Sequence, residues 1–283
     1  MKKGLILEGG AMRGMFTCGI LDVVMENGIE FDGIIGVSAG AAFGCNYISK
    51  QPGRAIRYNM KYCRDKRFCS VNSLIKTGNI FGAEFAYHTL PDELDIFDRN
   101  TFENNKTEFY VCATDIKTGK AVYHKCKKGD YEDLEWIRAS ASMPFVSVPV
   151  EIGGYKMLDG GFSDAVPVRF FESIGYDRNI VILTRPDGYV KKKDSSIPLA
   201  RYTFRKFPKA LKTFEQHHIV YNDTLKYIKK KEKNGEILVI RPEKKLEIGR
   251  IEHNPGNLKK IYDIGRNLAN RELQKVISFL NKA

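Results

Sequence analysis

Apolar positions near the start of the chain follow two periods in turn, and they predict two successive strand–turn–helix units. Gly4–Leu7 is a short apolar run, and Met15–Asn27 carries apolar residues at helical spacing. Phe31–Val37 repeats the strand pattern, and Ala39–Ser49 is typical of a helix rich in small residues. Strands that alternate with helices at this interval predict parallel βαβ units.

The rest of the chain continues this mixture of strands and helices. Arg54–Lys106 is predicted to be mostly helical, with aromatic and basic residues interleaved. Further strands are expected at Glu108–Thr114, Ala121–Lys125, Val146–Ile152, Lys156–Leu158, Asn179–Thr184 and Ile237–Ile240. Further helices are expected at Tyr131–Ser142, Thr213–Lys233 and Asn257–Lys282. These elements predict an α/β protein whose C-terminal region is mainly helical with one strand.

Composition excludes some classes of protein, and the charge distribution suggests a partner. The 283 residues are 43% hydrophobic and 28% charged, which excludes a disordered or fibrous chain. Residues 1–184 hold 22 basic and 23 acidic side chains, whereas residues 185–283 hold 24 and 11. The net charge of +12 therefore lies in the last third, where we expect peripheral contact with an anionic membrane. The alternative is a set of solvated lysine-rich helix faces. No helix-turn-helix, zinc-finger or RNP motif supports a nucleic-acid partner.

Cysteine usage and hydropathy predict a cytoplasmic location, peripheral to the inner face of the membrane. The six cysteines form no CxxC pair, so we expect reduced thiols. The N-terminal apolar run ends at Glu8, too early for a signal peptide. The longest uncharged run, Gly33–Ser49, is too short to cross a bilayer.

A G-x-S-x-G pattern lies between the second predicted strand and its helix. It consists of Gly36, Val37, Ser38, Ala39 and Gly40. A serine at a tight strand-to-helix turn projects its hydroxyl outward, and small flanking residues let the backbone bend. The helix that follows directs its N-terminal amides toward developing negative charge. The pattern favours a nucleophilic serine over a merely structural turn.

Two further glycine-rich loops supply candidate partners for this serine. The first follows the first strand and lacks the lysine of a P-loop and the third glycine of a dinucleotide fingerprint. It remains an amide-rich turn at a helix N-terminus, suited to an oxyanion, and it comprises Gly9, Gly10, Ala11, Met12, Arg13 and Gly14. The second loop is Asp159-Gly160-Gly161, which offers a candidate general base. A structural turn is the alternative for each loop.

These three pieces, in this order, resemble the patatin-like phospholipase family, most of all its bacterial branch. The resemblance covers about Lys3 to Val168 and includes the stretches 138–144 and 164–168. It implies a three-layer α/β/α fold with a mostly parallel sheet. It also implies a catalytic domain at 1–188, which leaves 189–283 as a basic C-terminal region packed on the core.

The resemblance further implies a serine acyl hydrolase that cleaves lipid esters, of phospholipase A or lysophospholipase type, with neither metal nor cofactor. Ser38 is then the nucleophile, Asp159 its base, and the Gly9–Gly14 loop the oxyanion hole. Ala11 stands where the family usually has glycine. Acyl-chain length, headgroup, positional preference and oligomeric state are left open by the sequence.

Two other functions stay open at this point. An α/β-hydrolase would complete a Ser–Asp–His triad with a late histidine, namely His217, His218 or His253. We expect His217 and His218 to be surface residues of a basic helix. A non-catalytic lipid-binding module is the second alternative. The segment Arg54–Lys106 either covers the active site or is an ordinary amphipathic helix pair packed on the core.

Overall fold

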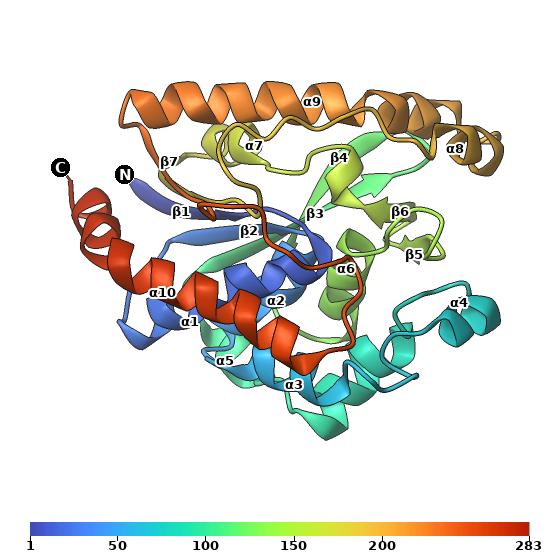
Figure 1. Cartoon of the computed structure of the whole chain (residues 1–283), viewed down its shortest axis with the longest axis horizontal. Coiled ribbons are helices and arrows are strands. Elements are labelled where there is room, and N and C mark those ends of the chain that lie inside the picture. The colour runs from blue at the N-terminus through green and yellow to red at the C-terminus, as the bar shows by residue number, and fades with distance from the viewer. Residues whose placement is uncertain (283) are drawn as a thin grey trace.

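A mixed sheet of eight strands forms the centre of the computed structural model, which describes residues 1–282 (Figure 1). The strand order is β5-β6-β3-β2-β1-β7-β8, with β4 paired to β3 off this path. The strands are β1 (Lys2–Leu7), β2 (Gly33–Val37), β3 (Glu108–Asp115), β4 (Lys120–Cys126), β5 (Val150–Ile152), β6 (Tyr155–Asp159), β7 (Tyr176–Ile182) and β8 (Ile237–Ile240). Neighbours among β1, β2, β3, β7 and β8 are parallel, whereas β4, β5 and β6 pair antiparallel. The prediction of a mostly parallel sheet is confirmed.

Helices cover both faces of this sheet and give the three expected layers. In Figure 1, α9 runs along one face and α1, α2 and α10 cover the other. The α-helices of residues 1–282 are α1 (Gly14–Glu26), α2 (Ala39–Ile48), α3 (Arg54–Tyr62), α4 (Val71–Thr77), α5 (Arg99–Asn104), α6 (Tyr131–Ser140), α7 (Val168–Ser173), α8 (Ile197–Thr203), α9 (Pro208–Lys233) and α10 (Pro255–Leu280). A π-helical segment, η2 (Phe85–Leu94), lies between α4 and α5. Arg54–Lys106 is thus mostly helical, as predicted.

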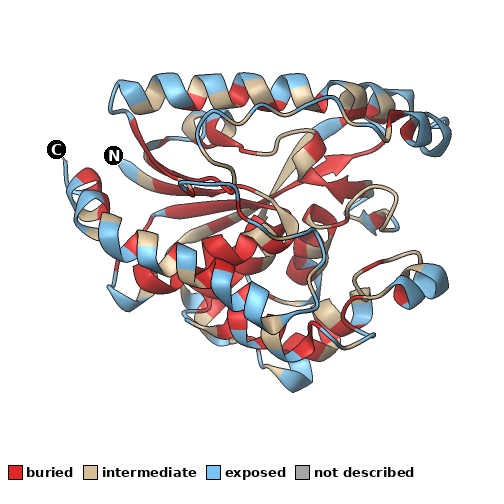
Figure 2. Ribbon diagram, viewed as in Figure 1, coloured by how far each residue is buried: buried red, intermediate tan, exposed pale blue. Residues whose placement is uncertain are grey.

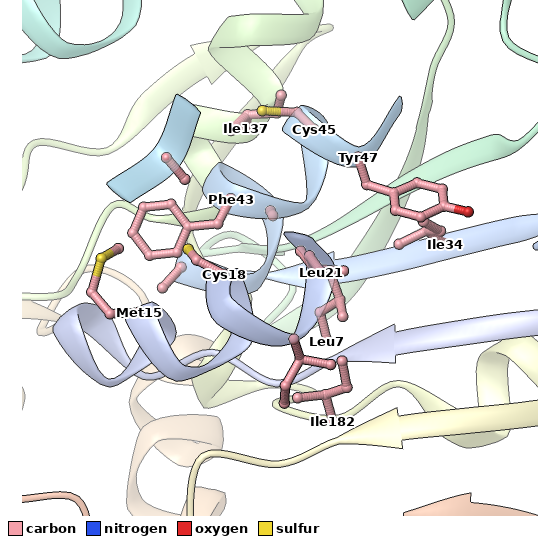
Figure 3. Close-up of a cluster of buried hydrophobic side chains, with 14 of the residues drawn as sticks. Leu7, Met15, Cys18, Leu21, Ile34, Phe43, Cys45, Tyr47, Ile137 and Ile182 are labelled. Carbon is pink, nitrogen blue, oxygen red and sulfur yellow. The ribbon is translucent and has the colours of Figure 1, made fainter. Parts of the chain in front are cut away.

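Alternation along the strands decides which side chains enter which layer. Leu5 and Ile34 are buried in the cluster formed with α1 and α2, while Ile6 and Ile35 are buried in the cluster formed with α7 and α9. Figure 3 shows the first of these clusters, in which Leu7 and Ile182 from the sheet lie near Leu21 of α1. Successive side chains of a strand point to opposite faces, so strands covered on both sides are apolar throughout.

The C-terminal region completes both the sheet and the core. β8 pairs in parallel with β7, and α10 packs against α1 at close range. A Cβ at Gly265 of α10 would lie 2.0 Å from the carbonyl oxygen of Phe16, so only glycine permits this approach. Tyr262 donates a hydrogen bond of 2.6 Å to the buried carboxylate of Asp22. Figure 2 shows that α9 and α10 expose only their outer faces.

One predicted strand is shorter than expected. The run Val146–Ile152 predicts seven strand residues, but β5 begins at Val150. The carbonyl of Val146 accepts from the amide of Ile80, and the amide of Val148 donates to the side chain of Asn79. These bonds hold the stretch against the loop after α4, and Pro149 has no N–H to donate to a ladder. The prediction of a strand over 146–149 is therefore wrong.

All six cysteines are buried free thiols. Within residues 1–282, every helix is too short or too polar to cross a membrane.

Candidate active site

Ser38 occupies a sharp turn between β2 and α2. Its backbone has φ of 55° and ψ of −122°, a strained conformation for a residue with a side chain. The glycines on either side allow the turn. A Cβ at Gly36 would lie 2.5 Å from the Gly40 backbone, and a Cβ at Gly40 would lie 2.4 Å from the carbonyl oxygen of Leu7. The small residues predicted around the serine are thus required sterically.

Asp159 ends β6 and faces Ser38 directly. The Ser38 hydroxyl donates a hydrogen bond of 2.6 Å to Oδ2 of Asp159. The sheet topology explains this meeting. β4 occupies one edge of β3, so β2 and β6 share the other, with Val37 opposite Cys112 and Asp159 opposite Ala113. Since Cys112 and Ala113 are consecutive, the ends of β2 and β6 meet. The side chains of Ser38, which follows Val37, and Asp159, which ends β6, therefore converge.

Two serines of the stretch 138–144 hold this pair in place, although nothing in the sequence predicted a specific role for them. Ser140 Oγ accepts from the backbone amide of Ser38 at 2.9 Å and donates to the carbonyl oxygen of Cys112 at 2.6 Å. The carbonyl oxygen of Ser142 accepts from the amide of Asp159 at 2.8 Å. The only signal for these roles was that the family resemblance includes this stretch.

The environment of Asp159 perturbs its ionisation. The side chain is 7% exposed, and burial raises the pKa of this carboxyl from 3.8 to about 6. Hydrogen bonds from Ser38 and from the Gly161 amide, the latter 2.7 Å from Oδ1, act in the opposite direction, as do the charges of Lys191 and Arg250. A carboxylate with a pKa near 6 is a better proton acceptor than an ordinary aspartate and is still ionised at neutral pH.

The glycine-rich loop after β1 lies against the serine. A Cβ at Gly9 would sit 2.9 Å from Cβ of Ser38. The amides of Arg13 and Gly14 donate within the turn. In residues 1–282, the amides of Gly10 and Ala11 donate to no other residue. These two amides, with that of Met12 beside them, are the loop's candidates for an oxyanion. Ala11 has a left-handed φ of 48°, which disfavours any residue with a Cβ.

An apolar pocket opens beside Ser38. Ala11, Ser38 and residues of α2 and α6 line it. The segment 54–106 contributes much of the remaining wall, with Tyr58, Phe68, Phe81, Tyr87, Leu90 and Phe97. The same segment also packs on the core, where Tyr58, Phe68 and Leu90 are buried, so a cover over the site stays a prediction. The apolar lining suits an acyl chain.

None of the histidines in residues 1–282 hydrogen-bonds to Ser38 or Asp159. His217 is only 6% exposed, and its Nδ1 lies 2.6 Å from the carbonyl oxygen of Phe214. The expectation of a surface position is therefore wrong for His217, because it shares the core-facing stripe of α9 with Phe214 and Tyr221. His253 contacts the carbonyl of Cys63. The geometry provides no third member for a triad.

One group of potential metal ligands occurs outside the site. His124, Cys126 and Asp133 bring one ligand atom each to within 4.8 Å of one another. Asp133 Oδ2 already accepts hydrogen bonds from the backbone amides of residues 127–129, so this carboxylate closes the loop between β4 and α6. The arrangement is explained without an ion.

Comparisons with known proteins place the chain in a family. The patatin-like phospholipase model matches residues 5–171, and a domain of unknown function matches residues 207–281. The chain is 30% identical to the uncharacterized protein YjjU of Escherichia coli over 93% of its own length and 74% of that protein. It is also 30% identical to lysophospholipase nte1 of Aspergillus niger, over 62% of this chain and only 11% of that protein.

Among solved structures, VipD from Legionella pneumophila aligns over 97% of this chain and 67% of its own, with 12% identity and a TM-score of 0.48. The family model alone covers more than half of the chain. The chain belongs to the patatin-like phospholipase family and is an enzyme of the lipid acyl hydrolase class.

Proposed function

We propose that Ser38 and Asp159 form a catalytic dyad that hydrolyses a carboxylic ester of a lipid, of phospholipase A or lysophospholipase type. The observation that carries this proposal is the 2.6 Å hydrogen bond from the Ser38 hydroxyl to Asp159 Oδ2 at the mouth of an apolar pocket. A nucleophile, its base and a chain-binding cavity are the parts that acyl transfer from a lipid requires.

In this mechanism the ionised Asp159 accepts the proton of Ser38 as the hydroxyl attacks the ester carbonyl. The amides of Gly10 and Ala11 donate to the oxyanion of the tetrahedral intermediate, each worth about 3 kcal/mol in other acyl-transfer enzymes. Protonated Asp159 then supplies its proton to the departing alcohol. In the second half, water attacks the acyl ester of Ser38 with Asp159 again as the base, which releases the fatty acid and restores the serine.

In this proposal residues 1–188 carry the chemistry, and the basic region 189–283 helps the enzyme meet an anionic membrane at the cytoplasmic face. α8 exposes Leu199 by 49% and Tyr202 by 69%, and exposed cations such as Arg205 and Lys206 follow. α4 exposes Ile75 by 79%. Both helices lie at the end of the molecule that holds β5 and β6 (Figure 1). Apolar tips flanked by cations suit the interface of an anionic bilayer.

Hydrolysis of a p-nitrophenyl ester and a panel of phospholipids by wild type, Ser38→Ala and Asp159→Asn tests the dyad. Wild type is expected to cleave both substrate types, and both variants to lose activity. A folded Ser38→Ala enzyme that keeps wild-type activity would overturn the proposal. A fluorophosphonate probe that labels wild type but not Ser38→Ala would separate an enzyme from a lipid-binding module.

Sedimentation with vesicles tests the membrane contact. Binding to vesicles that contain phosphatidylglycerol is expected to weaken between low and high salt, because exposed charges are screened within about 10 Å at 0.1 M salt. Ile75→Ser is expected to slow hydrolysis of aggregated lipid more than that of a monomeric ester. Equal effects on both substrates, with salt-independent binding, would contradict this contact.

A further inference from the structure

A group of cations lies beside the glycine-rich loop, on residues that the dyad does not use. Arg13 belongs to that loop, and Arg185 and Lys191 follow β7. The guanidinium of Arg13 folds back over the loop, since a Cβ at Gly10 would lie 3.1 Å from its Nη2. Its Nε also approaches Thr184 Oγ1 at 3.4 Å. This places the positive charge of Arg13 next to the candidate oxyanion amides.

Lys191 is held at the site by its main chain. Its amide donates to Asn222 Oδ1 at 2.8 Å, and its carbonyl accepts from Asn222 Nδ2 at 2.9 Å. Its Nζ lies 4.9 Å from the ring centre of Tyr221. The guanidinium carbon of Arg185 lies 4.5 Å from the ring centre of Tyr189. Both cations therefore rest on aromatic faces, which orient a charge without neutralising it.

The nearby carboxylate of Glu8 forms no salt bridge with these cations, although its charge acts on Arg13 and Lys191. Glu8 is 3% exposed, and it already accepts from the amide and hydroxyl of Thr184 and from the hydroxyl of Tyr221. Across residues 1–282, no acidic side chain forms a salt bridge with Arg13, Arg185 or Lys191. Elsewhere in the basic region, cations such as Lys229 and Arg266 are paired.

The cations also act on one another. Burial, followed by the neighbouring Arg185, lowers the pKa of Arg13. Burial lowers the pKa of Lys191, the charges of Glu8 and Asp159 raise it, and the charge of Arg13 lowers it by a smaller amount. The three cations outnumber the carboxylates of Glu8 and Asp159 that act on them. Like charges gathered in a partly buried place are unfavourable unless a further anion joins them. Lys191 lies near enough to Asp159 for its charge to act on that carboxyl, so an anion here would be close to the reacting ester.

We propose that Arg13, Arg185 and Lys191 form a subsite for the phosphate of the lipid substrate, so that the enzyme prefers phosphate-bearing esters over neutral ones. This inference rests on the proposed function, since it assigns a headgroup site to the same reaction centre. In a glycerophospholipid only two or three carbons separate the ester oxygen from the phosphate oxygen. The acyl chain would enter the apolar pocket, and the phosphate would meet two guanidinium forks and one ammonium, all suited to its oxygens.

A matched pair of substrates tests this subsite. 1-Palmitoyl-lysophosphatidylcholine and 1-monopalmitoylglycerol share the acyl chain and the ester, and only the first has a phosphate. We expect Lys191→Gln and Arg185→Gln each to lower the ratio of their kcat/KM values by about tenfold, the effect of losing one charged hydrogen bond. Lys191→Arg should retain most of the preference. The control Lys230→Gln, which removes the same charge from an exposed position, should leave the ratio at its wild-type value.

The ratio isolates the headgroup from the chemistry. Loss of Lys191 also removes a charge that acts on Asp159, but that change slows both substrates alike. Thermal unfolding of each variant identifies those that do not fold. A ratio that stays at the wild-type value in folded Lys191→Gln and Arg185→Gln would overturn the subsite.

Binding to the inactive Ser38→Ala protein provides a second arm. Calorimetry should detect binding of glycerophosphocholine to Ser38→Ala. The double variant that also carries Lys191→Gln should give no binding heat. If inorganic phosphate binds but the substrate ratio does not respond to Lys191→Gln, the site holds free anions and the headgroup proposal is wrong. If wild type cleaves no lipid ester, the proposed function fails. Glycerophosphocholine binding then still decides whether the cations recognise a headgroup.

Discussion

The two sides of Ser38 differ in chemistry and in the part of the chain that supplies them. On one side, α2, α6 and the segment 54–106 build an apolar pocket. On the other side, Arg13 and the connection after β7 bring cations and a buried carboxylate network. Binding to an apolar wall is favourable in proportion to the apolar area that is removed from water, at about 25 cal/mol per Å². A cationic surface instead binds through electrostatic attraction, which salt screens and weakens. Chain length and headgroup are therefore expected to be selected by separate parts of the molecule.

The largest effect is expected at the residue between the two sides. Asp159→Asn should lower kcat by about 10⁴-fold on charged and neutral esters alike, as for other acids that assist a serine. The same change should stabilise the fold at pH 7 by up to about 3 kcal/mol, because a pKa raised from 3.8 to about 6 means that burial opposes the charged form.

The pH dependence of this stabilisation follows from the direction of the shift. The native state holds the Asp159 proton more tightly than the unfolded chain does, so this group costs stability as the pH rises from about 4 to about 6. The advantage of Asp159→Asn should be complete above pH 6 and absent below pH 4, measured by urea unfolding. Ser38→Ala serves as a control that loses activity without this gain. An Asn variant no more stable than wild type at pH 7 would contradict the buried charge.

The apolar side is tested by narrowing the pocket. Ala42→Leu adds three carbons to the lining and should exclude a similar length of acyl chain, each methylene being worth about 0.8 kcal/mol. The ratio of kcat/KM for palmitoyl to butyryl esters is expected to fall about 60-fold, whereas salt should not alter it. Ala42→Gly, which widens the same place, is the matched control. An unchanged chain-length profile in Ala42→Leu would mean that the chain binds elsewhere.

The pH dependence of kcat/KM sharpens the comparison, because the same proposed base, Asp159, serves neutral and phosphate-bearing esters. With a pKa of about 6, the fraction of ionised base falls below that pH, so kcat/KM should drop about tenfold per pH unit there. The limb should be the same for neutral and phosphate-bearing esters. Since the charge of Lys191 lowers the pKa of Asp159, Lys191→Gln should move this limb to higher pH. Activity that stays level down to pH 4 would exclude Asp159 as the base.

The smallest effect is expected at Ser140, which positions the Ser38 backbone and lines neither the apolar pocket nor the cationic side. Ser140→Ala leaves the buried Ser38 amide without its acceptor and the Cys112 carbonyl without its donor. We expect a loss of about 1–3 kcal/mol in unfolding free energy and a lower kcat for both substrates. Ser142→Ala is the matched control, because Ser142 binds Asp159 through its carbonyl and keeps that contact. Equal losses in the two variants would remove the special role of Ser140.

Local pattern was enough to locate most elements of the fold. The βαβ start, the strands β3 and β4, and β8 at Ile237–Ile240 all follow from the spacing of apolar residues, which depends only on neighbours along the chain. The G-x-S-x-G pattern likewise located the Ser38 turn, since its glycines are needed by the backbone within a few residues. The short helices α7 and α8 carry too few turns to show a period.

Features that depend on distant partners were not visible in the sequence. His217 is buried because α9 crosses the sheet, and Ser140 meets Ser38 across 102 positions of sequence. The contact between Arg13 and Thr184 spans 171 positions. The spacing of apolar residues does not show which strands pair along the same edge of a third strand. The meeting of β2 and β6 on one edge of β3 could therefore be seen only in the structure. The catalytic roles of the site residues remain predictions, which the experiments above address.

The shared edge of β3 has a consequence for how the enzyme would lose activity. β6 pairs with β3 through only three residues, Ala113 to Asp115, and its other partner is the three-residue strand β5. This hairpin can open while the parallel strands stay closed, because few hydrogen bonds hold it. Opening would carry Asp159 away from Ser38 and leave Ser38 on an intact core. Inactivation by mild denaturant should therefore precede global unfolding, with amide hydrogen exchange fastest along β5 and β6.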